Sequence, residues 1–270
     1  MSATRHVELH WRDRAVRIEH RWIAEQDRRL PLVVFLHEGL GSLSLWKDFP
    51  DRLCAAAGCR GLVYSRPGYG RSTARRADDA WGVDFLHQQA HEVLPALLTA
   101  LGVDAEHEPP WLFGHSDGAS IALLFASARP QAVAGVVALA PHTHVEAVAV
   151  HSIAQARDAY LRNGLNGLRE KLARHHDDPD SAFWGWNDIW LHPDFKRWTI
   201  EREIEAIRCP LLAIQGMDDE YGTLAQIHGI ARRLPQTELL EVADCGHSAH
   251  RDQPDAVIAA TAHFMQRHRR

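Results

Sequence analysis

A serine flanked by small residues occurs in the stretch 114–118, which reads Gly-His-Ser-Asp-Gly. This G-x-S-x-G spacing is typical of a tight turn between a strand and a helix that exposes the serine hydroxyl as a nucleophile. The flanking residues fit this arrangement, because residues 111–113 are apolar and the alanine- and leucine-rich segment 119–128 ends just before Pro130. The pattern predicts that Ser116 lies on such a turn.

A serine hydroxyl becomes a strong nucleophile only when a histidine accepts its proton and a carboxylate holds that histidine. With this kind of turn, the acid follows the serine in the chain and the histidine comes last. Asp219 and His247 each lie on a turn that follows a short apolar run late in the chain. The order predicts a catalytic triad of Ser116, Asp219 and His247. Asp218 and Glu146 are alternative acids.

The elements that must position these residues are predicted from apolar periodicity. Two alternating segments, 7–11 and 15–23, predict an antiparallel hairpin. Apolar runs predict strands that are covered on both faces, at 32–36, 62–64, 111–113, 133–139 and 211–214, and residues 238–242 are a further strand candidate. Helical patterns alternate with these runs, at 47–57, 83–101, 119–128 and 254–266. The alternation predicts an α/β fold with a mostly parallel, eight-stranded sheet flanked by helices.

One long segment, 141–208, has helical patterns and no strand candidate. We expect it to be a helical lid (cap) inserted after the sixth strand, while residues 1–140 and 209–270 form the core. Residues 141–146 follow that strand beside the expected site, and we interpret them as a hinge with solvated histidines. A chain of 270 residues, 46% of them hydrophobic, is long enough for one large core with such a lid.

Aromatic residues are concentrated in the predicted lid, where Trp184, Trp186 and Trp190 lie within one helical stretch. Large aromatic rings can form the wall of an apolar pocket, although packing of the lid on the core is the other interpretation. These three residues are candidate substrate contacts. They indicate a substrate with an apolar or aromatic part.

Composition excludes several classes of partner. The net charge is −5 and no long basic block occurs, so we do not expect a nucleic acid partner. No run of about 18 apolar residues occurs, and the first residues lack an apolar secretion signal, so we expect neither a membrane span nor export. The predicted location is cytoplasmic. The four cysteines have no C-x-x-C spacing and are expected to be reduced and mostly buried.

Two further motifs do not predict a cofactor or a metal ion. Residues 39–44 follow a strand and begin like a dinucleotide-binding loop, but the third glycine and the acidic residue are missing. His87 and His91 share a helix face, but the glutamate of H-E-x-x-H is absent. With 19 histidines in the chain, such a pair is expected by chance. We therefore predict no cofactor and no metal.

The turn at 114–118, the turn that ends in Asp219 and the turn that contains His247 together resemble the motifs of the α/β-hydrolase family. The likeness extends from about residue 32 to the last helix. The resemblance implies the α/β-hydrolase fold, and it favours Asp219 over Asp218 as the acid.

The resemblance also implies an oxyanion hole, formed by the backbone N–H groups of Gly39 and Asp117. The family's usual His-Gly loop corresponds to His37-Glu38-Gly39, with a glutamate where glycine is common. His37, Glu38 and Glu146 are further candidates for substrate contacts.

The function implied by the resemblance is that of a serine hydrolase that cleaves a small carboxylic ester, or a thioester or lactone, through an acyl-enzyme. A serine in place of an aspartate at position 116 argues against the haloalkane dehalogenase and epoxide hydrolase branches. A carbon–carbon bond hydrolase of aromatic catabolism and a non-enzymatic ligand receptor on the same fold are the alternatives. Each of them would bind a small molecule.

Overall fold

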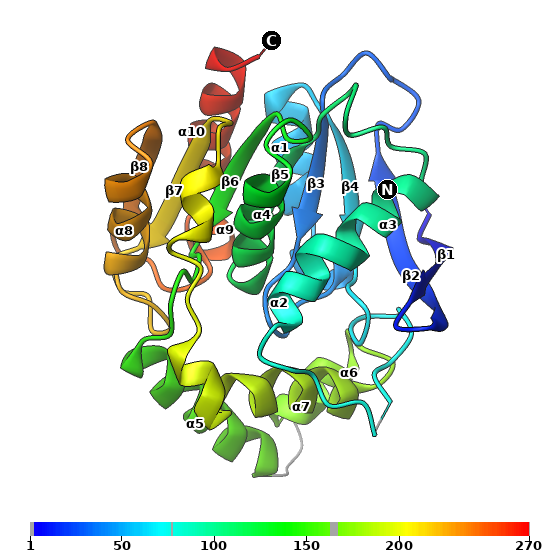
Figure 1. Ribbon diagram of the computed structural model, residues 1–270, viewed down its shortest axis with the longest axis vertical. Helices are drawn as coiled ribbons and strands as arrows, with labels where there is room; N and C mark the ends of the chain where they lie inside the picture. The colour runs from blue at the N-terminus through cyan, green and yellow to red at the C-terminus, as the bar shows by residue number, and fades with distance from the viewer. Residues whose placement is uncertain (1–2, 77, 163–166, 270) are drawn as a thin grey trace.

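One sheet of eight strands, in the order β1-β2-β4-β3-β5-β6-β7-β8, forms the centre of the protein in the computed structural model (Figure 1). The model describes residues 3–76, 78–162 and 167–269. The hairpin β1 (Arg5–Trp11) and β2 (Arg14–Ile23) is antiparallel, as is the pairing of β2 with β4 (Arg60–Tyr64). The other neighbours are parallel, and their strands are β3 (Leu32–Leu36), β5 (Trp111–His115), β6 (Gly135–Leu139), β7 (Leu211–Gly216) and β8 (Thr237–Val242). The predicted fold class is confirmed.

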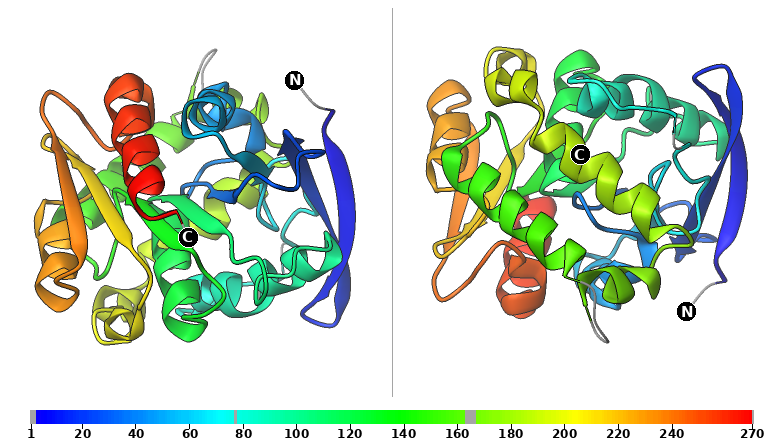
Figure 2. Two further views of the ribbon diagram at one scale, coloured as in Figure 1. Left: turned by 90° about the horizontal axis from the view of Figure 1, so that it is seen from above. Right: turned by 90° about the horizontal axis from the view of Figure 1, so that it is seen from below.

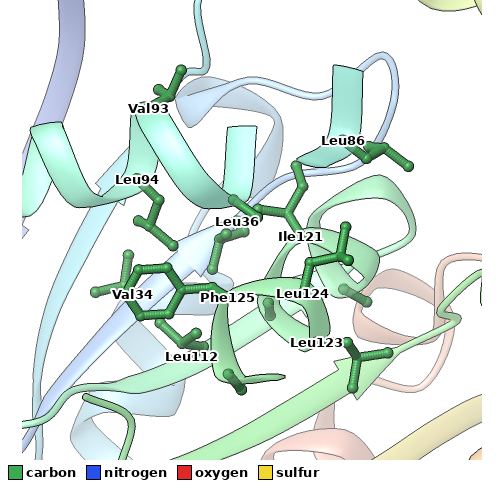
Figure 3. Close-up of a cluster of buried hydrophobic side chains, with 14 of the residues drawn as sticks. Val34, Leu36, Leu86, Val93, Leu94, Leu112, Ile121, Leu123, Leu124 and Phe125 are labelled. Carbon is green, nitrogen blue, oxygen red and sulfur yellow. The ribbon is translucent and has the colours of Figure 1, made fainter. Parts of the chain in front are cut away.

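Helices cover both faces of the sheet, which explains why β3 to β7 are entirely buried and mostly apolar. On one face, α4 (Asp117–Ala128) packs with the helix that ends in α3 (Leu94–Ala100). Figure 3 shows the apolar side chains gathered there, including those of α4, β3 and β5. On the other face lie α1 (Phe49–Ala57) and α10 (Pro254–Arg267).

Two helices differ from the sequence prediction. The pattern at 83–101 forms α2 (Phe85–Gln88), a π-helical turn (Gln89–Val93) and then α3. Pro95 lies in the first turn of α3 and has no N–H to donate, which loosens the regular ladder at this point. The pattern at 47–57 forms α1, which begins two residues later than predicted, at Phe49, and a separate 3-10 turn, Leu43–Trp46, precedes it.

Two helices were not predicted. Helix α8 (Ala225–Arg233) lies between β7 and β8, and α9 (Ala249–Asp252) precedes α10. In α8 the only large apolar side chains that are buried are Ile227 and Ile230, so its apolar stripe is too narrow to stand out in the sequence.

Between β6 and β7 the chain forms three helices, α5 (Ala147–Leu161), α6 (Leu168–Ala173) and α7 (Pro179–Trp190), and two 3-10 turns, η3 (Pro193–Arg197) and η4 (Glu203–Ala206). Figures 1 and 2 show α5 and α7 lying across one end of the sheet. We refer to residues 141–208 as the cap segment. Its buried side chains join the same apolar cluster as those of α4. The division of the chain into core and cap remains a prediction.

All four cysteines are buried, as expected. Within the described ranges, no helix is long and apolar enough to cross a membrane.

Candidate active site

Ser116 lies on the turn between β5 and α4, with φ 54° and ψ −119°. A residue with a side chain rarely adopts such a backbone, and strain of this kind is common at catalytic positions. The turn needs glycine on both sides. A Cβ atom on Gly114 would lie 2.3 Å from the carbonyl oxygen of Gly118, and one on Gly118 would lie 2.0 Å from that of Leu36. The G-x-S-x-G spacing therefore reflects close approach of β3, β5 and α4.

His247 and Asp219 are in direct contact. Nδ1–H of His247 donates to both carboxylate oxygens of Asp219, at 2.9 Å each. The Asp219 side chain is 1% exposed, and it also accepts hydrogen bonds from the backbone N–H groups of Tyr221 and Gly222 and from Nε2 of Gln215. Burial raises the pKa of Asp219, but the hydrogen bond and charge of His247 outweigh it, and the net pKa is lowered. The arrangement holds the proton of His247 on Nδ1, which leaves Nε2 free to accept one.

Ser116 and His247 both line a cavity of about 140 Å³ beneath the cap segment. Its remaining walls come from the segments after β3, β6, β7 and β8, from the turn between β5 and α4, and from α5 and α7. They comprise Glu38, Gly39, Leu40, His115, Asp117, His142, Ile153, Trp186, Trp190, Tyr221 and Ser248. The cavity brings the predicted nucleophile and base together with aromatic rings of the cap.

Both predicted oxyanion donors, Gly39 and Asp117, lie in the cavity wall. Asp117 is the first residue of α4, and the carbonyl of Ser116 accepts hydrogen bonds from the N–H groups of Ala119 (2.9 Å) and Ser120 (3.1 Å). C=O and N–H point in opposite directions in a trans peptide, so the N–H of Asp117 points out of the helix. In the described part of the chain, the N–H groups of Gly39 and Asp117 have no acceptor. They are available to a negatively charged oxygen.

The side chain of Asp117 has other partners than its backbone N–H group. It is fully buried, accepts a hydrogen bond from Nε1–H of Trp190 at 3.1 Å, and lies 3.5 Å from Nη2 of Arg66. Burial raises the pKa of Asp117, and the charge of Arg66 opposes that rise. The side chain thus connects the turn to the cap segment and to the loop after β4.

Glu38 lies in the cavity wall, but its carboxylate is held by two neighbours. Nη2 of Arg251 donates to Oε1 at 3.0 Å, and Nδ1 of His115 lies 3.5 Å from Oε2. Burial raises the pKa of Glu38, but His115 and Arg251 together hold it well below its usual value. His115 also donates from Nε2 to the carbonyl oxygen of His247 at 2.9 Å. Glu38 is thereby linked to the turns that carry the predicted nucleophile and base.

His37 and Glu146, two of the candidates for substrate contact, lie outside the cavity wall. His37 is fully buried: its Nδ1–H donates to the carbonyl of Glu38 at 2.7 Å, and its Nε2 accepts the N–H of Arg66 at 2.9 Å. Glu146 accepts hydrogen bonds from Thr223 N–H (2.9 Å), Thr223 Oγ1–H (2.6 Å) and Gln226 Nε2–H (2.8 Å). Glu146 therefore ties the start of α5 to the loop after β7, and it is Asp219 that pairs with the histidine.

The three cap tryptophans occupy different environments. Trp186 lies against residues 37–41, which carry the predicted donor Gly39 and which we call the oxyanion loop, since a Cβ atom on Gly39 would be 2.3 Å from Nε1 of Trp186. Trp190 packs on His142, with ring centroids 4.9 Å apart. Trp184 instead packs on Tyr160 and Phe183 within the cap segment, and it does not line the cavity.

His142 shows that part of the hinge interpretation was wrong. We expected solvated histidines at 141–146, but His142 is 3% exposed and lines the cavity, with its ring centroid 5.9 Å from that of His247. Burial lowers the pKa of His142 to about 3, so the ring is neutral at physiological pH. Its position directly after β6 was the one sequence signal that placed it near the site.

Comparison with known proteins identifies the family and the fold of this chain. The family model described as "Alpha/beta hydrolase family" matches residues 33–260. The sn-1-specific diacylglycerol lipase of Mus musculus is 26% identical over 268 residues, covering 90% of this chain and 83% of the lipase. The 2-hydroxy-6-oxo-6-phenylhexa-2,4-dienoate hydrolase of Burkholderia cepacia is 23% identical over 257 residues, covering 86% and 87%.

Among solved structures, a thermophilic esterase from Thermogutta terrifontis superposes with a TM-score of 0.76 at 16% identity, over 99% of both chains. This likeness extends to the fold. With the family model matching most of its length, the chain belongs to the alpha/beta hydrolase family.

Proposed function

We propose that this protein is a serine hydrolase that cleaves small carboxylic esters with a compact apolar or aromatic part. The observation that carries the proposal is the contact of His247 with both oxygens of Asp219, in the wall of the cavity that Ser116 also lines. A serine, a histidine and a buried carboxylate in this order on strand ends form the arrangement that activates a hydroxyl.

In the proposed reaction, Oγ of Ser116 attacks the ester carbonyl while Nε2 of His247 takes its proton. The N–H groups of Gly39 and Asp117 stabilise the resulting oxyanion. His247 returns the proton to the departing alcohol, which leaves an acyl group on Ser116. Water then attacks the acyl carbon, again with His247 as the base, and the acid is released. Asp219 stabilises the positive charge of His247 in both steps.

The cavity suggests the size and nature of the substrate. At about 140 Å³ it would hold a short or compact group, and Trp186, Trp190 and Ile153 make its cap side apolar. His142 is neutral and buried, so it offers a hydrogen-bonding group without a charge. Thioesters and lactones of similar size would suit the same machinery. The lipase name of the mouse relative and the esterase name of the solved structure are consistent with ester cleavage.

The second candidate is hydrolysis of a carbon–carbon bond in an aromatic ring-cleavage product. The Burkholderia cepacia relative carries such a name, and such substrates have a polar keto group and an apolar aryl group. His142 is a specific observation in favour of it, because its Nδ1 has no partner among the described residues. Carbon–carbon cleavage makes a carbon leaving group that must be protonated, and a second hydrogen-bonding group beside His247 would help to orient such a substrate.

Aryl esters of increasing acyl length, assayed with wild type and Ser116→Ala, test the proposal. The substitution is small, so the fold should be retained while kcat falls by several orders of magnitude. Labelling by a fluorophosphonate probe should be lost in parallel. Near-normal turnover by Ser116→Ala would contradict the assignment.

The same purified wild-type protein also tests the two alternative functions, a carbon–carbon hydrolase and a ligand receptor. Faster turnover of a 2-hydroxy-6-oxo-dienoate than of any ester would favour the carbon–carbon hydrolase. Binding without turnover of either class would favour the ligand receptor.

A further inference from the structure

Arg66, directly after β4, is a buried cation with few partners. Its side chain is 0% exposed, and Nε and Nη1 have no hydrogen-bond partner among the described residues. Within the same part of the chain, Nη2 alone makes polar contacts, to the carbonyl oxygen of Glu38 at 2.8 Å and to Oδ2 of Asp117 at 3.5 Å. The guanidinium lies 4.6 Å from the ring centre of Tyr69. Burying a charge with unsatisfied N–H groups is unfavourable for folding, so a role beyond stability would explain why an arginine stands at this position.

The first contact of Arg66 orients one oxyanion donor. The carbonyl of Glu38 accepts three hydrogen bonds, from Arg66 Nη2 (2.8 Å), His37 Nδ1 (2.7 Å) and the N–H of Gly41 (3.0 Å). This carbonyl belongs to the same peptide as the N–H of Gly39. Because C=O and N–H of a trans peptide are antiparallel, fixing the carbonyl fixes the direction of the N–H. The three donors therefore hold the Gly39 N–H in one orientation.

The second contact of Arg66 reaches the other donor residue. Asp117 supplies the second N–H, and its carboxylate is held by Arg66 on Oδ2 and by Nε1–H of Trp190 on Oδ1, at 3.1 Å. One nitrogen of Arg66 thus bridges the carbonyl that orients the Gly39 N–H and the carboxylate of Asp117. The same carboxylate joins this bridge to the cap segment.

We propose that Arg66 is a positioning residue that sets the geometry of the oxyanion hole by holding Glu38 and Asp117 together beneath it. The inference rests on the proposed serine hydrolase function. Arg66 does not line the cavity, so it acts through the peptide carbonyl of Glu38 and the side chain of Asp117 and not on the substrate. Oxyanion-hole donors are effective because they are already oriented when charge develops, and loss of one such donor lowers kcat by about 10²- to 10³-fold.

Arg66→Met tests the proposal, since methionine fills much of the space without a donor or a charge. The carbonyl of Glu38 would keep two of its three donors, so the hole should loosen and not disappear. We expect kcat on an aryl ester to fall by about ten- to a few hundredfold with KM changed less than threefold. Activity is normalised to the enzyme titrated by a fluorophosphonate, which removes any effect of a smaller folded fraction.

An aryl trifluoromethyl ketone gives a second readout. Addition of the Ser116 hydroxyl to this ketone forms a hemiketal whose oxygen occupies the oxyanion hole. The inhibition constant should therefore rise by about the same factor as kcat/KM falls. A residue that only stabilised the fold would leave this constant unchanged for the molecules that remain folded.

Arg60→Met is the matched control. Arg60 is also a buried arginine, 3% exposed, but it begins β4 and its Nε donates to the carbonyl of Leu30 at the opposite end of the strand. We expect it to lower stability while leaving kcat and the inhibition constant within twofold of wild type. Arg66→Lys should recover part of the loss, because a single ammonium can replace the one nitrogen that makes both contacts.

If Arg66→Met does not fold, Arg66→Gln provides the test, with the same expected changes in kcat and inhibition constant. The proposal is overturned if the neutral variant that folds keeps both values within threefold of wild type. Ser116→Ala distinguishes failure of the proposed role of Arg66 from failure of the proposed serine hydrolase function. Loss of turnover in Ser116→Ala with unchanged Arg66 variants would refute only the role of Arg66, whereas turnover retained in Ser116→Ala would refute the proposed function itself.

Discussion

Replacing Asp219 by asparagine should disable the base while leaving the shape of the site intact. Oδ1 of Asp219 accepts the N–H groups of Tyr221 and Gly222, and Oδ2 accepts Nε2–H of Gln215. Backbone donors move less easily than a side-chain amide, so the oxygen of the new amide should take the place of Oδ1. Its NH₂ group would then take the place of Oδ2, where it faces His247.

Nδ1–H of His247 would then meet a donor at the Oδ2 position, and its remaining acceptor, Oδ1, is already shared with two backbone donors. The tautomer with the proton on Nε2 is therefore favoured. In that tautomer Nε2 cannot accept the proton of Ser116. The substitution also removes the negative charge that lies 2.9 Å from Nδ1 of His247, so the imidazolium formed during reaction is no longer stabilised. A wrong tautomer at this position lowers kcat by about 10⁴-fold, which corresponds to about 5.5 kcal/mol of transition-state stabilisation.

The assay is kcat and KM for an aryl ester, with the fold checked by circular dichroism. KM should change little, because Asp219 is absent from the cavity wall. Raising the pH through the alkaline range should not restore the rate, because the defect is one of tautomer and charge.

Asp218→Asn and Glu146→Gln are the controls. Asp218 is exposed, and Glu146 binds Thr223 and Gln226, whereas the carboxylate in contact with His247 is that of Asp219. We expect each variant to retain kcat within about threefold, with Glu146→Gln losing roughly 1 kcal/mol of stability through its weakened hydrogen bonds. If Glu146→Gln were the more damaging change, the assignment of the acid to Asp219 would be wrong.

Two further predictions concern the cavity wall. Trp186→Ala should lower kcat/KM for a bulky aryl ester about ten- to 200-fold more than for an acetate ester, because only the larger substrate fills the pocket. Trp184→Ala should instead lower thermal stability and affect both esters equally. Equal discrimination between the two esters in both variants would show that Trp186 only packs the cap segment on the core. The pKa of His142 is about 3 in the folded state against 6.5 for a free histidine, so protonation of the unfolded chain favours unfolding as the pH falls below 6.5. The free energy of unfolding in urea should therefore fall between pH 6 and pH 5 by about 1 kcal/mol more in wild type than in His142→Gln, and parallel pH dependences would refute the burial of this ring.

Much of the fold and the centre of the site were predictable because their signals are local. Strands covered on both faces appear as continuous apolar runs, and the turn at Ser116 needs small residues within two positions of the serine. Because parallel strands end at one edge of a sheet, residues that follow β5, β7 and β8 come together whatever their distance in sequence. The sequence alone therefore indicated Ser116, Asp219 and His247, and the structure places His247 against Asp219.

What the sequence did not determine is how side chains from separate segments meet. Trp184 and Trp186 are two positions apart and equally aromatic, yet one packs inside the cap and the other against the oxyanion loop. Arg66 follows the predicted strand at 62–64 and carries a charge, and His142 belongs to the segment interpreted as a hinge, but both are buried.

Burial of these groups depends on contacts that no local pattern contains. Arg66 is enclosed because the loops after β3 and β4 and the first turn of α4 close around it, and His142 because α7 places Trp190 on its ring. Charge and hydrogen-bonding capacity are properties of the residue type and can be read from the sequence. The role of a charged or polar side chain also depends on its exposure to solvent and on its partners. Segments distant along the chain determine both, and only the tertiary structure brings those segments together.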